Sequence, residues 1–303
     1  MNKRGFTDAN VPDQSGRCFM VTGANTGLGF ETAQVLASRG ARVLLACRNE
    51  KKASAAIERI RNRHPDANLA FLPLDQSDLS SVRHAAELAS REDRLDVLIN
   101  NAGIMSSHSE LTGDGIEQHF AVNHLAPFAL TLLLLPKLSE TAGSRVVITS
   151  SLVHKNGKPD FDDIRRENGA RPSQLYANSK LANLLFLHEL SRRLRVAGSG
   201  VAAVGCHPGM ASTELSRDLP AFVRALSPLL SKLVNSALQG AWPTLQAACD
   251  PGVEPGGYYG PQRMGGAKGP AGPAKRSPQA TSDALASRLW EISEELTGVK
   301  FDL

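Results

Sequence analysis

The fold of this protein is decided by the stretch Thr22-Gly23-Ala24-Asn25-Thr26-Gly27-Leu28-Gly29. It directly follows a short apolar run, 18–21, and it opens a segment of helical length, 28–38. Glycines in such a turn let the backbone approach a pyrophosphate closely, while the N–H groups and dipole of the helix N-terminus offset the phosphate charge. The turn therefore predicts a dinucleotide site with contacts from Gly23, Asn25, Thr26, Gly27, Leu28 and Gly29. A tight strand-to-helix turn that binds nothing is the alternative.

Short apolar runs alternate with helical segments over most of the chain. The expected strands are 18–21, 42–47, 69–72, 97–99, 145–149 and 201–205, and the expected helices are 28–38, 51–63, 79–90, 116–138 and 176–194. Strands separated by helices lie parallel when each crossover is right-handed, and continuous apolar runs such as 146–148 are typical of strands buried on both faces. The sequence therefore predicts the α/β class, with one doubly wound, mostly parallel sheet of the Rossmann type in a single domain over 1–303.

Three segments fall outside this alternation. Residues 210–239 are variable and helical, and we expect them to shape the substrate site. Their apolar residues form either a lid or the packed underside of two short helices: Leu215, Leu219, Phe222, Val223, Leu226, Leu229 and Leu230. Residues 255–278 are dense in glycine and proline, which predicts an irregular surface loop. Ser282 and the apolar spacing after it predict a capped amphipathic helix over 282–297.

Composition and charge exclude several classes of protein. With 42% hydrophobic and 21% charged residues among 303, the chain is not disordered, collagen-like or a coiled coil. Its 34 basic and 30 acidic residues are spread in short groups, so we expect no nucleic-acid partner. The polar residues 1–16 and the short apolar stretch 125–135, which stops at Pro136, predict neither a signal peptide nor a membrane span.

The cysteines and histidines predict a reducing compartment and no metal centre. Cys18, Cys47, Cys206 and Cys249 lie far apart without a CxxC spacing, and we expect a cytoplasmic location. The eight histidines form no HExxH pattern. Cys206 and His207 are adjacent, but no third orienting group is apparent, so we interpret them as packing neighbours rather than a nucleophilic pair.

The end of the second expected strand predicts which dinucleotide binds. NAD-selective sites place a carboxylate there, roughly 20 residues beyond the glycines, to accept hydrogen bonds from the adenosine ribose. This chain has Cys47 followed by Arg48, whose planar guanidinium can hold a 2′-phosphate through paired charge-assisted bonds. We therefore predict NADP(H) in preference to NAD(H), with an ordinary surface arginine as the alternative.

Tyr176 and Lys180 are the candidate proton-transfer residues. Four residues apart in an expected helix, they project from one face and can converge on one ligand. A phenol with its ordinary pKa of about 10 is a poor base at neutral pH, but an adjacent ammonium and an oxidised nicotinamide favour the phenolate. The spacing alone occurs by chance, and the alternative is an exposed tyrosine beside a surface lysine. The assignment to proton transfer is supported by polar residues that we expect at the same edge of the sheet: Asn100 to Gly103, Asn123, Ser150 and Ser151.

In these combined motifs the chain resembles the short-chain dehydrogenase/reductase family, in its non-extended branch with the glycine spacing TGxxxGxG. The resemblance covers nearly the whole chain. It implies that Tyr176 is the general acid/base, that Lys180 lowers the phenol pKa and holds the nicotinamide ribose, and that Asn123 supports a proton-relay water. It also implies that Ser151, the second serine of the SSxxx pattern, polarises the substrate carbonyl. Alternatively Ser151 packs and Ser150 faces the site.

The same resemblance implies further cofactor contacts. They are an adenine contact at Asp75, a cofactor-lining run at Asn101, Ala102 and Gly103, and a segment closing over the nicotinamide at Pro208, Gly209 and Thr213. Some of these residues have a plainer alternative. Asp75 and Thr213 are then helix caps, and Pro208-Gly209 is only a turn.

The long interval between Ser151 and Tyr176 is similar to that of the retinol dehydrogenase-like subgroup, which usually prefers NADP(H). Three short motifs are similar as well: Ala46-Cys47-Arg48, Leu181-Ala182-Asn183 and His207-Pro208-Gly209. The interval also contains Asp160, Asp162 and Asp163, which resemble an acid/base pair but fit a solvated loop better.

We therefore expect an NADP(H)-dependent oxidoreductase that transfers a hydride between the nicotinamide and an apolar aldehyde or ketone, or its alcohol. Two other functions stay open: a catalytically idle NADP(H)-binding interaction protein, and a carbon–carbon double-bond reductase of the protochlorophyllide reductase type. Many relatives pair subunits through the helix expected over 176–194. A homo-oligomer is therefore one possibility, because this helix has a wide apolar face formed by Leu184, Leu185, Leu187 and Leu190.

Overall fold

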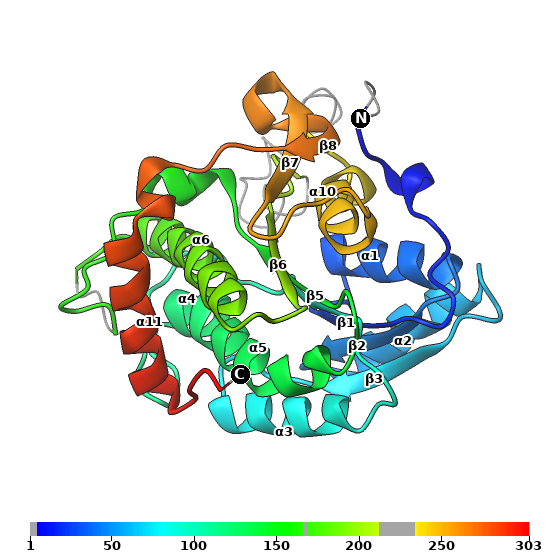
Figure 1. Ribbon diagram of the computed structural model, residues 1–303, viewed down its shortest axis with the longest axis horizontal. Helices are drawn as coiled ribbons and strands as arrows, with labels where there is room; N and C mark the ends of the chain where they lie inside the picture. The colour runs from blue at the N-terminus through cyan, green and yellow to red at the C-terminus, as the bar shows by residue number, and fades with distance from the viewer. Residues whose placement is uncertain (1–4, 166–168, 212–233, 303) are drawn as a thin grey trace.

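An eight-stranded sheet forms the centre of the structure (Figure 1). The computed structural model describes residues 5–165, 169–211 and 234–302. The strands are β1 (Cys18–Thr22), β2 (Arg42–Cys47), β3 (Leu69–Pro73), β4 (Val97–Asn100), β5 (Arg145–Thr149), β6 (Ala202–Cys206), β7 (Tyr258–Arg263) and β8 (Lys268–Pro273). Their order is β3-β2-β1-β4-β5-β6-β7-β8, and every neighbouring pair is parallel except β7 and β8. The predicted doubly wound, mostly parallel sheet is confirmed.

Helices cover both faces of this sheet. One face carries α1 (Gly27–Ser38), α2 (Glu50–Arg61) and α10 (Ala237–Cys249), and the other carries α3 (Leu79–Ser90), α5 (Ala126–Ser139), α6 (Pro172–Val196) and α11 (Asp283–Thr297). Successive residues of β1 serve opposite faces: Phe19 and Val21 pack with the first set of helices, and Met20 packs with the second. Because both faces are buried, the strands are apolar throughout, as their sequence indicated.

The prediction of an irregular loop over 255–278 is wrong. This segment forms the hairpin of β7 and β8, joined through a short 3-10 turn, η4 (Met264–Gly266). β8 is the last strand of the sheet, and prolines are tolerated at such an edge because its outer side has no ladder to interrupt. On that outer side Phe6 exchanges two backbone hydrogen bonds with Ala271, of 2.8 and 2.9 Å.

The single helix expected over 116–138 is divided into three parts. These are α4 (Gln118–Phe120), a π-helical turn, η2 (Ala121–Leu125), and α5, which contains Pro136 and ends at Ser139, one residue beyond the expected end. Among the residues that the structure describes, the stretch Gln118–Ser139 is the one helix long and apolar enough to cross a membrane. Its most apolar window is 78% buried inside the protein, which is typical of a core helix.

The C-terminal helix α11 packs against α6, where Trp290 lies 5.9 Å from the Phe186 ring and 5.0 Å from the Phe128 ring of α5. The Ser282 hydroxyl caps this helix by accepting a hydrogen bond from the Leu285 N–H, as predicted. The chain's own C-terminal helix therefore covers part of the wide apolar surface that the sequence gives to α6.

The variable segment is described only at its two ends. Thr213 and the seven apolar residues from Leu215 to Leu230 lie outside the described residues. At the far end of the segment begins α10, which the sequence analysis did not anticipate; Ser236 and Gln239 form a capping box there.

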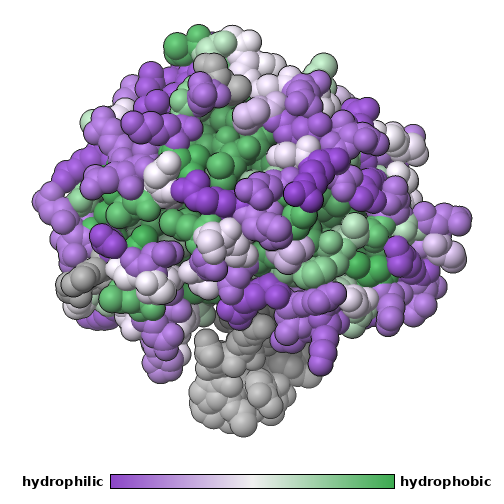
Figure 2. Space-filling model, turned by 90° about the horizontal axis from the view of Figure 1, so that it is seen from below, coloured by the Kyte–Doolittle hydropathy of each residue, from purple (hydrophilic) through white to green (hydrophobic). Residues whose placement is uncertain are grey.

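Figure 2 shows a mostly hydrophilic surface with smaller hydrophobic areas between the polar side chains. Within the described part of the chain, five large apolar side chains are exposed: Met105, Leu111, Val196, Met210 and Met264. Two of these methionines directly follow segments that the sequence assigns to the cofactor, since Met105 comes two residues after Gly103 and Met210 comes one after Gly209.

Candidate active site

The glycine turn after β1 has the backbone shape that the prediction requires. Gly23 and Gly27 have positive φ angles, +69° and +57°, which side chains rarely adopt. A Cβ on Gly29 would lie 2.5 Å from the Gly23 carbonyl oxygen, so only glycine allows the first turn of α1 to approach β1 this closely. Thr26 is the N-cap of α1, and the N-terminal N–H groups of the helix are available for an anion.

The segment after β4 is fastened to this turn. The Thr22 hydroxyl oxygen accepts hydrogen bonds from the backbone N–H groups of Asn101 (3.0 Å) and Ala102 (2.9 Å). The Asn101 side-chain amide in turn donates to the Thr22 carbonyl at 2.8 Å. β1 and β4 are neighbours from which the strand order runs in opposite directions, and ligands bind outside the carboxyl ends of strands at such a switch point.

Arg48 and Asp75 lie close together at the ends of β2 and β3. The Arg48 Nη1 is 3.8 Å from the Asp75 Oδ2, and the arginine side chain is 74% exposed and free to reach a ligand. Asp75 is not the cap of the following helix; that place belongs to Asp78, which accepts from the Ser80 N–H at 2.8 Å. The alternative interpretation of Asp75 is therefore wrong.

Tyr176 and Lys180 lie on α6, which begins one turn earlier than predicted, at Pro172. Both side chains are buried, and the Lys180 Nζ lies 5.5 Å from the centre of the Tyr176 ring. The interpretation of an exposed tyrosine beside a surface lysine is therefore wrong. A Cβ on Gly103 would lie 3.1 Å from the Lys180 Nζ and 3.1 Å from the Asn123 Oδ1, so the candidate groups meet at this glycine.

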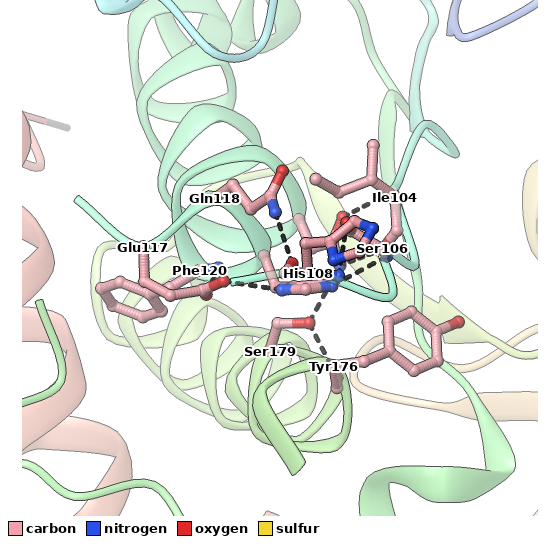
Figure 3. A network of polar contacts seen from close by, with 10 residues as sticks. Ile104, Ser106, His108, Glu117, Gln118, Phe120, Tyr176 and Ser179 are labelled. Atoms are coloured by element: carbon pink, nitrogen blue, oxygen red, sulfur yellow. Dashed lines mark hydrogen bonds and ion pairs between the residues drawn. The ribbon is translucent and has the colours of Figure 1, made fainter. Parts of the chain in front are cut away.

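Asn123 lies in the π-helical turn, and its amide is committed to protein partners. Its Oδ1 accepts from the Ile104 N–H at 2.7 Å, and its Nδ2 donates to the Ile104 carbonyl and the Ser179 hydroxyl, both at 2.9 Å. Ser179 donates onward to the Tyr176 carbonyl at 2.8 Å (Figure 3). The side chain of Asn123 thus ties the loop after β4 to the helix that carries the phenol.

The two serines at the end of β5 have different surroundings. The Ser150 hydroxyl donates to the Lys180 carbonyl at 2.7 Å. For the Ser151 hydroxyl, the described residues show no hydrogen bond, although the residue is only 5% exposed. This difference supports Ser151 as the serine that meets a substrate.

The remaining candidates have mainly structural contacts. The Pro208 carbonyl accepts from the Asn235 side chain at 3.0 Å, and a Cβ on Gly209 would lie 2.4 Å from the Ala267 carbonyl oxygen. This segment is therefore packed against the β7–β8 hairpin, and the closure of Pro208 and Gly209 over the nicotinamide stays a prediction. Asp162 forms an exposed ion pair with Arg288, which fits a solvated loop.

Cys206 and His207 are both buried but have separate partners. The Cys206 thiol contacts the hydroxyls of Thr149 and Thr244. Burial raises the thiol pKa, and burial lowers the pKa of His207 to about 3. In the ranges that the structure describes, no group of three or more potential ligands could hold a metal ion.

A family model described as short chain dehydrogenase matches residues 17–223 of this chain. The protein belongs to the short-chain dehydrogenase family. Human retinol dehydrogenase 12 is 40% identical over 98% of this chain and 90% of its own length, and human retinol dehydrogenase 11 is 41% identical over 95% and 87%. This short-chain dehydrogenase therefore falls in the retinol dehydrogenase-like subgroup and is an oxidoreductase acting on CH–OH or C=O groups.

Two solved structures have a similar fold. An uncharacterized protein from Mycobacterium paratuberculosis has a TM-score of 0.84 at 40% identity, over 99% of this chain and all of the other. A short chain dehydrogenase from Burkholderia cenocepacia J2315, solved in complex with NADP, has a TM-score of 0.63 at 25% identity, over 79% and 93%.

Two residues of this site, Glu117 and His119, were not among those proposed from the sequence of the short-chain dehydrogenase. Glu117 and His119 form a buried contact of 2.6 Å just before the π-helical turn, and the His119 ring lies 6.4 Å from the Tyr176 ring, edge to face. The sequence shows only a carboxylate and a histidine shortly before Asn123. Their pairing becomes apparent from the structure, in which both side chains are buried.

Proposed function

We propose that this enzyme transfers a hydride between NADP(H) and an apolar aldehyde or ketone, or the corresponding alcohol. The observation that carries the proposal is the meeting of Lys180 and Asn123 at Gly103, beside Tyr176 and next to the glycine turn. A side chain at Gly29 would collide with the Gly23 backbone, so glycine permits the tight strand-to-helix turn that a dinucleotide pyrophosphate requires, and the residues fit this cofactor. When bound, NADPH supplies the hydride.

The proton is assigned to Tyr176. In the reductive direction its hydroxyl gives a proton to the carbonyl oxygen while the carbonyl carbon gains the hydride. The ammonium of Lys180, held near the ring, stabilises the phenolate that remains. The free hydroxyl of Ser151 donates a hydrogen bond to the same oxygen and stabilises the charge that develops there. The side-chain amide of Asn123 is occupied by protein partners. A proton-relay water is therefore held by the backbone of the π-helical turn rather than by this side chain.

NADP(H) is proposed over NAD(H) because of the charges at the end of β2. Cys47 stands where NAD-selective sites have a carboxylate, and the exposed guanidinium of Arg48 can hold a 2′-phosphate. The NADP complex of the Burkholderia cenocepacia relative supports this choice. Asp75 and the run from Asn101 to Gly103 are proposed to contact the adenine and line the cofactor, respectively.

An apolar substrate is supported by two exposed side chains beside the cofactor-lining segments. Met105 is 54% exposed and Met210 is 45% exposed, and methionine adapts readily to apolar ligands of irregular shape. The curated relatives are retinol dehydrogenases, and retinol is itself an apolar alcohol.

The test is NADPH oxidation over a panel of apolar aldehydes and ketones, with wild type, Tyr176→Phe and the control Tyr259→Phe. The control removes a hydroxyl whose partner is the Glu254 N–H, away from the site. We expect turnover in wild type and control, and a loss of at least about a hundredfold in Tyr176→Phe. NADPH binding without turnover by wild type would instead favour the idle binding protein, and reduction of only carbon–carbon double bonds would favour the other alternative.

A cytoplasmic location is also proposed. The four cysteines are buried and free, which fits a reducing compartment. Fractionation of cells expressing the tagged chain tests this, and recovery with membranes would contradict it.

A further inference from the structure

A buried carboxylate and a buried imidazole form a pair at the start of the helix that contains Asn123. Glu117 is 1% exposed and His119 is fully buried. One carboxylate oxygen, Oε1, lies 2.6 Å from the His119 Nδ1, and the other, Oε2, accepts from the Phe120 N–H at 2.9 Å. Glu117 is thus the N-cap of a helical stretch of 22 residues, and its side chain satisfies one of the N–H groups at the start of that stretch.

The second ring nitrogen of His119 reaches the loop after β4. Its Nε2 accepts a hydrogen bond from the Ser106 N–H at 2.9 Å. Since this nitrogen accepts, the proton of the neutral ring is on Nδ1, which donates to Glu117. His119 therefore connects a fixed carboxylate on the helix to the backbone of the loop.

Two residues of this loop are held from the same helix. Asn123 holds Ile104 through two hydrogen bonds, and His119 holds Ser106 through one. Between them lies Met105, whose exposed side chain is presented by backbone fixed on both sides. The loop runs from the cofactor-lining Asn101 onward, and long connections of this kind in compact domains are usually functional.

We propose that Glu117 and His119 are positioning residues that fix the loop around Met105 against the active site and support the edge of the Tyr176 ring. For its kinetic consequence this inference rests on the proposed function. A buried histidine with satisfied hydrogen bonds also stabilises a fold, so the test separates the loop contact from general stability.

Two substitutions separate the two contacts of His119. His119→Gln places an amide oxygen near the position of Nε2, so it can still accept from the Ser106 N–H. His119→Asn places an amide N–H near the position of Nδ1, so it can still donate to Glu117 but is too short to reach the loop. The matched control is His108→Asn, which changes an exposed histidine of the same loop.

We expect His119→Asn to have a kcat at least about tenfold below that of His119→Gln, because small misplacements of a site are costly to catalysis. The Kd for NADPH is expected to stay within about threefold in all variants, since the glycine turn is untouched. Hydrogen exchange of the amides from 104 to 110 is expected to be faster in His119→Asn than in His119→Gln, and unchanged in the control beyond the substituted residue.

Equal kcat values and equal loop exchange in the two His119 variants would overturn the inference. So would a ranking of kcat that follows only the melting temperatures. If the wild-type enzyme turned over no carbonyl compound, the proposed function would fail on its own, whereas loop exchange would still decide whether His119 holds the loop. Should His119→Asn fail to fold, a kcat of folded His119→Gln more than about tenfold below wild type, with unprotected loop amides, would likewise overturn the inference.

Discussion

The Ser150 hydroxyl donates its hydrogen bond to the backbone carbonyl of Lys180, 2.7 Å away, and is thereby turned toward the helix and not toward a substrate. This leaves Ser151 as the serine with a free hydroxyl. We expect Ser151→Ala to lower kcat by about 10²-fold, as losses of single oxyanion donors do. Ser150→Ala is the control and is expected to cost mainly stability, about 1 kcal/mol. Steady-state kinetics and urea unfolding of both variants check this, and a larger fall of kcat in Ser150→Ala would reverse the assignment.

Arg48→Ala is expected to weaken NADPH binding much more than NADH binding. A charge-assisted hydrogen bond contributes about 1.5–3 kcal/mol, so the Kd for NADPH should rise by roughly 10- to 150-fold. Fluorescence titration with both cofactors measures the effect, with Lys52→Ala, an exposed lysine of α2, as control. An unchanged ratio of the two Kd values would mean that Arg48 is an ordinary surface residue.

The stability of the protein is expected to fall in acid because of buried neutral histidines. Burial lowers the pKa of His124 to about 3, whereas an unfolded chain binds its proton at the ordinary value of about 6.5. The unfolded state therefore takes up more protons as the pH falls below about 6.5, and stability is lost progressively down to about pH 3.

His124→Phe is expected to reduce this loss. The new ring keeps the stacking with Phe120, whose centroid lies 5.2 Å from that of His124, and it has no proton to bind. Urea unfolding at several pH values between 7 and 4 should give a shallower slope for the variant, by on the order of 1 kcal/mol per pH unit. The half-buried His64→Gln is the control, and a slope for His124→Phe equal to that of wild type would contradict the assignment of the effect to His124.

Trp290→Ala is expected to destabilise the protein by about 3–5 kcal/mol, since it removes a buried indole from between α5 and α6. It also exposes an apolar part of α6 that α11 covers in wild type. We therefore expect the variant, unlike wild type, to self-associate through this surface. Urea unfolding and light scattering measure both effects, against the exposed Val196→Ala as control. A variant as stable and as monodisperse as wild type would show that α11 does not cover this surface.

Most of the sheet could be predicted because its strands are buried on both faces. A β-branched apolar run such as Val146 to Ile148 is typical of a strand buried on both faces, and the glycine turn indicates where the first helix begins. β7 and β8 were missed for the opposite reason. Glycine and proline normally mark turns. The open outer side of β8 allows Pro273 within a strand, and the irregular register of the pairing with β7 allows Pro270.

Candidate site residues could be proposed from the sequence where they closely follow strands, as Asn101 and Ser151 do, or share a helix, as Tyr176 and Lys180 do. The π-helical turn around Asn123 could not, because helical periodicity does not reveal a local change in hydrogen bonding. The pairing of His119 with Ser106 could not either, since it joins a helix to a loop whose path depends on the whole fold.

The pairing of Phe6 with Ala271 has a consequence for the protein at high concentration. An exposed sheet edge offers free N–H and C=O groups to the strands of other molecules and invites aggregation. Here the outer edge of β8 has its groups at Ala271 already engaged by the protein's own N-terminal segment, the Gly269 N–H donates to the Asn235 side chain, and Pro273 has no N–H to offer. A strand of another molecule would find few free hydrogen-bonding groups along this edge. The edge is therefore protected against intermolecular β-sheet formation.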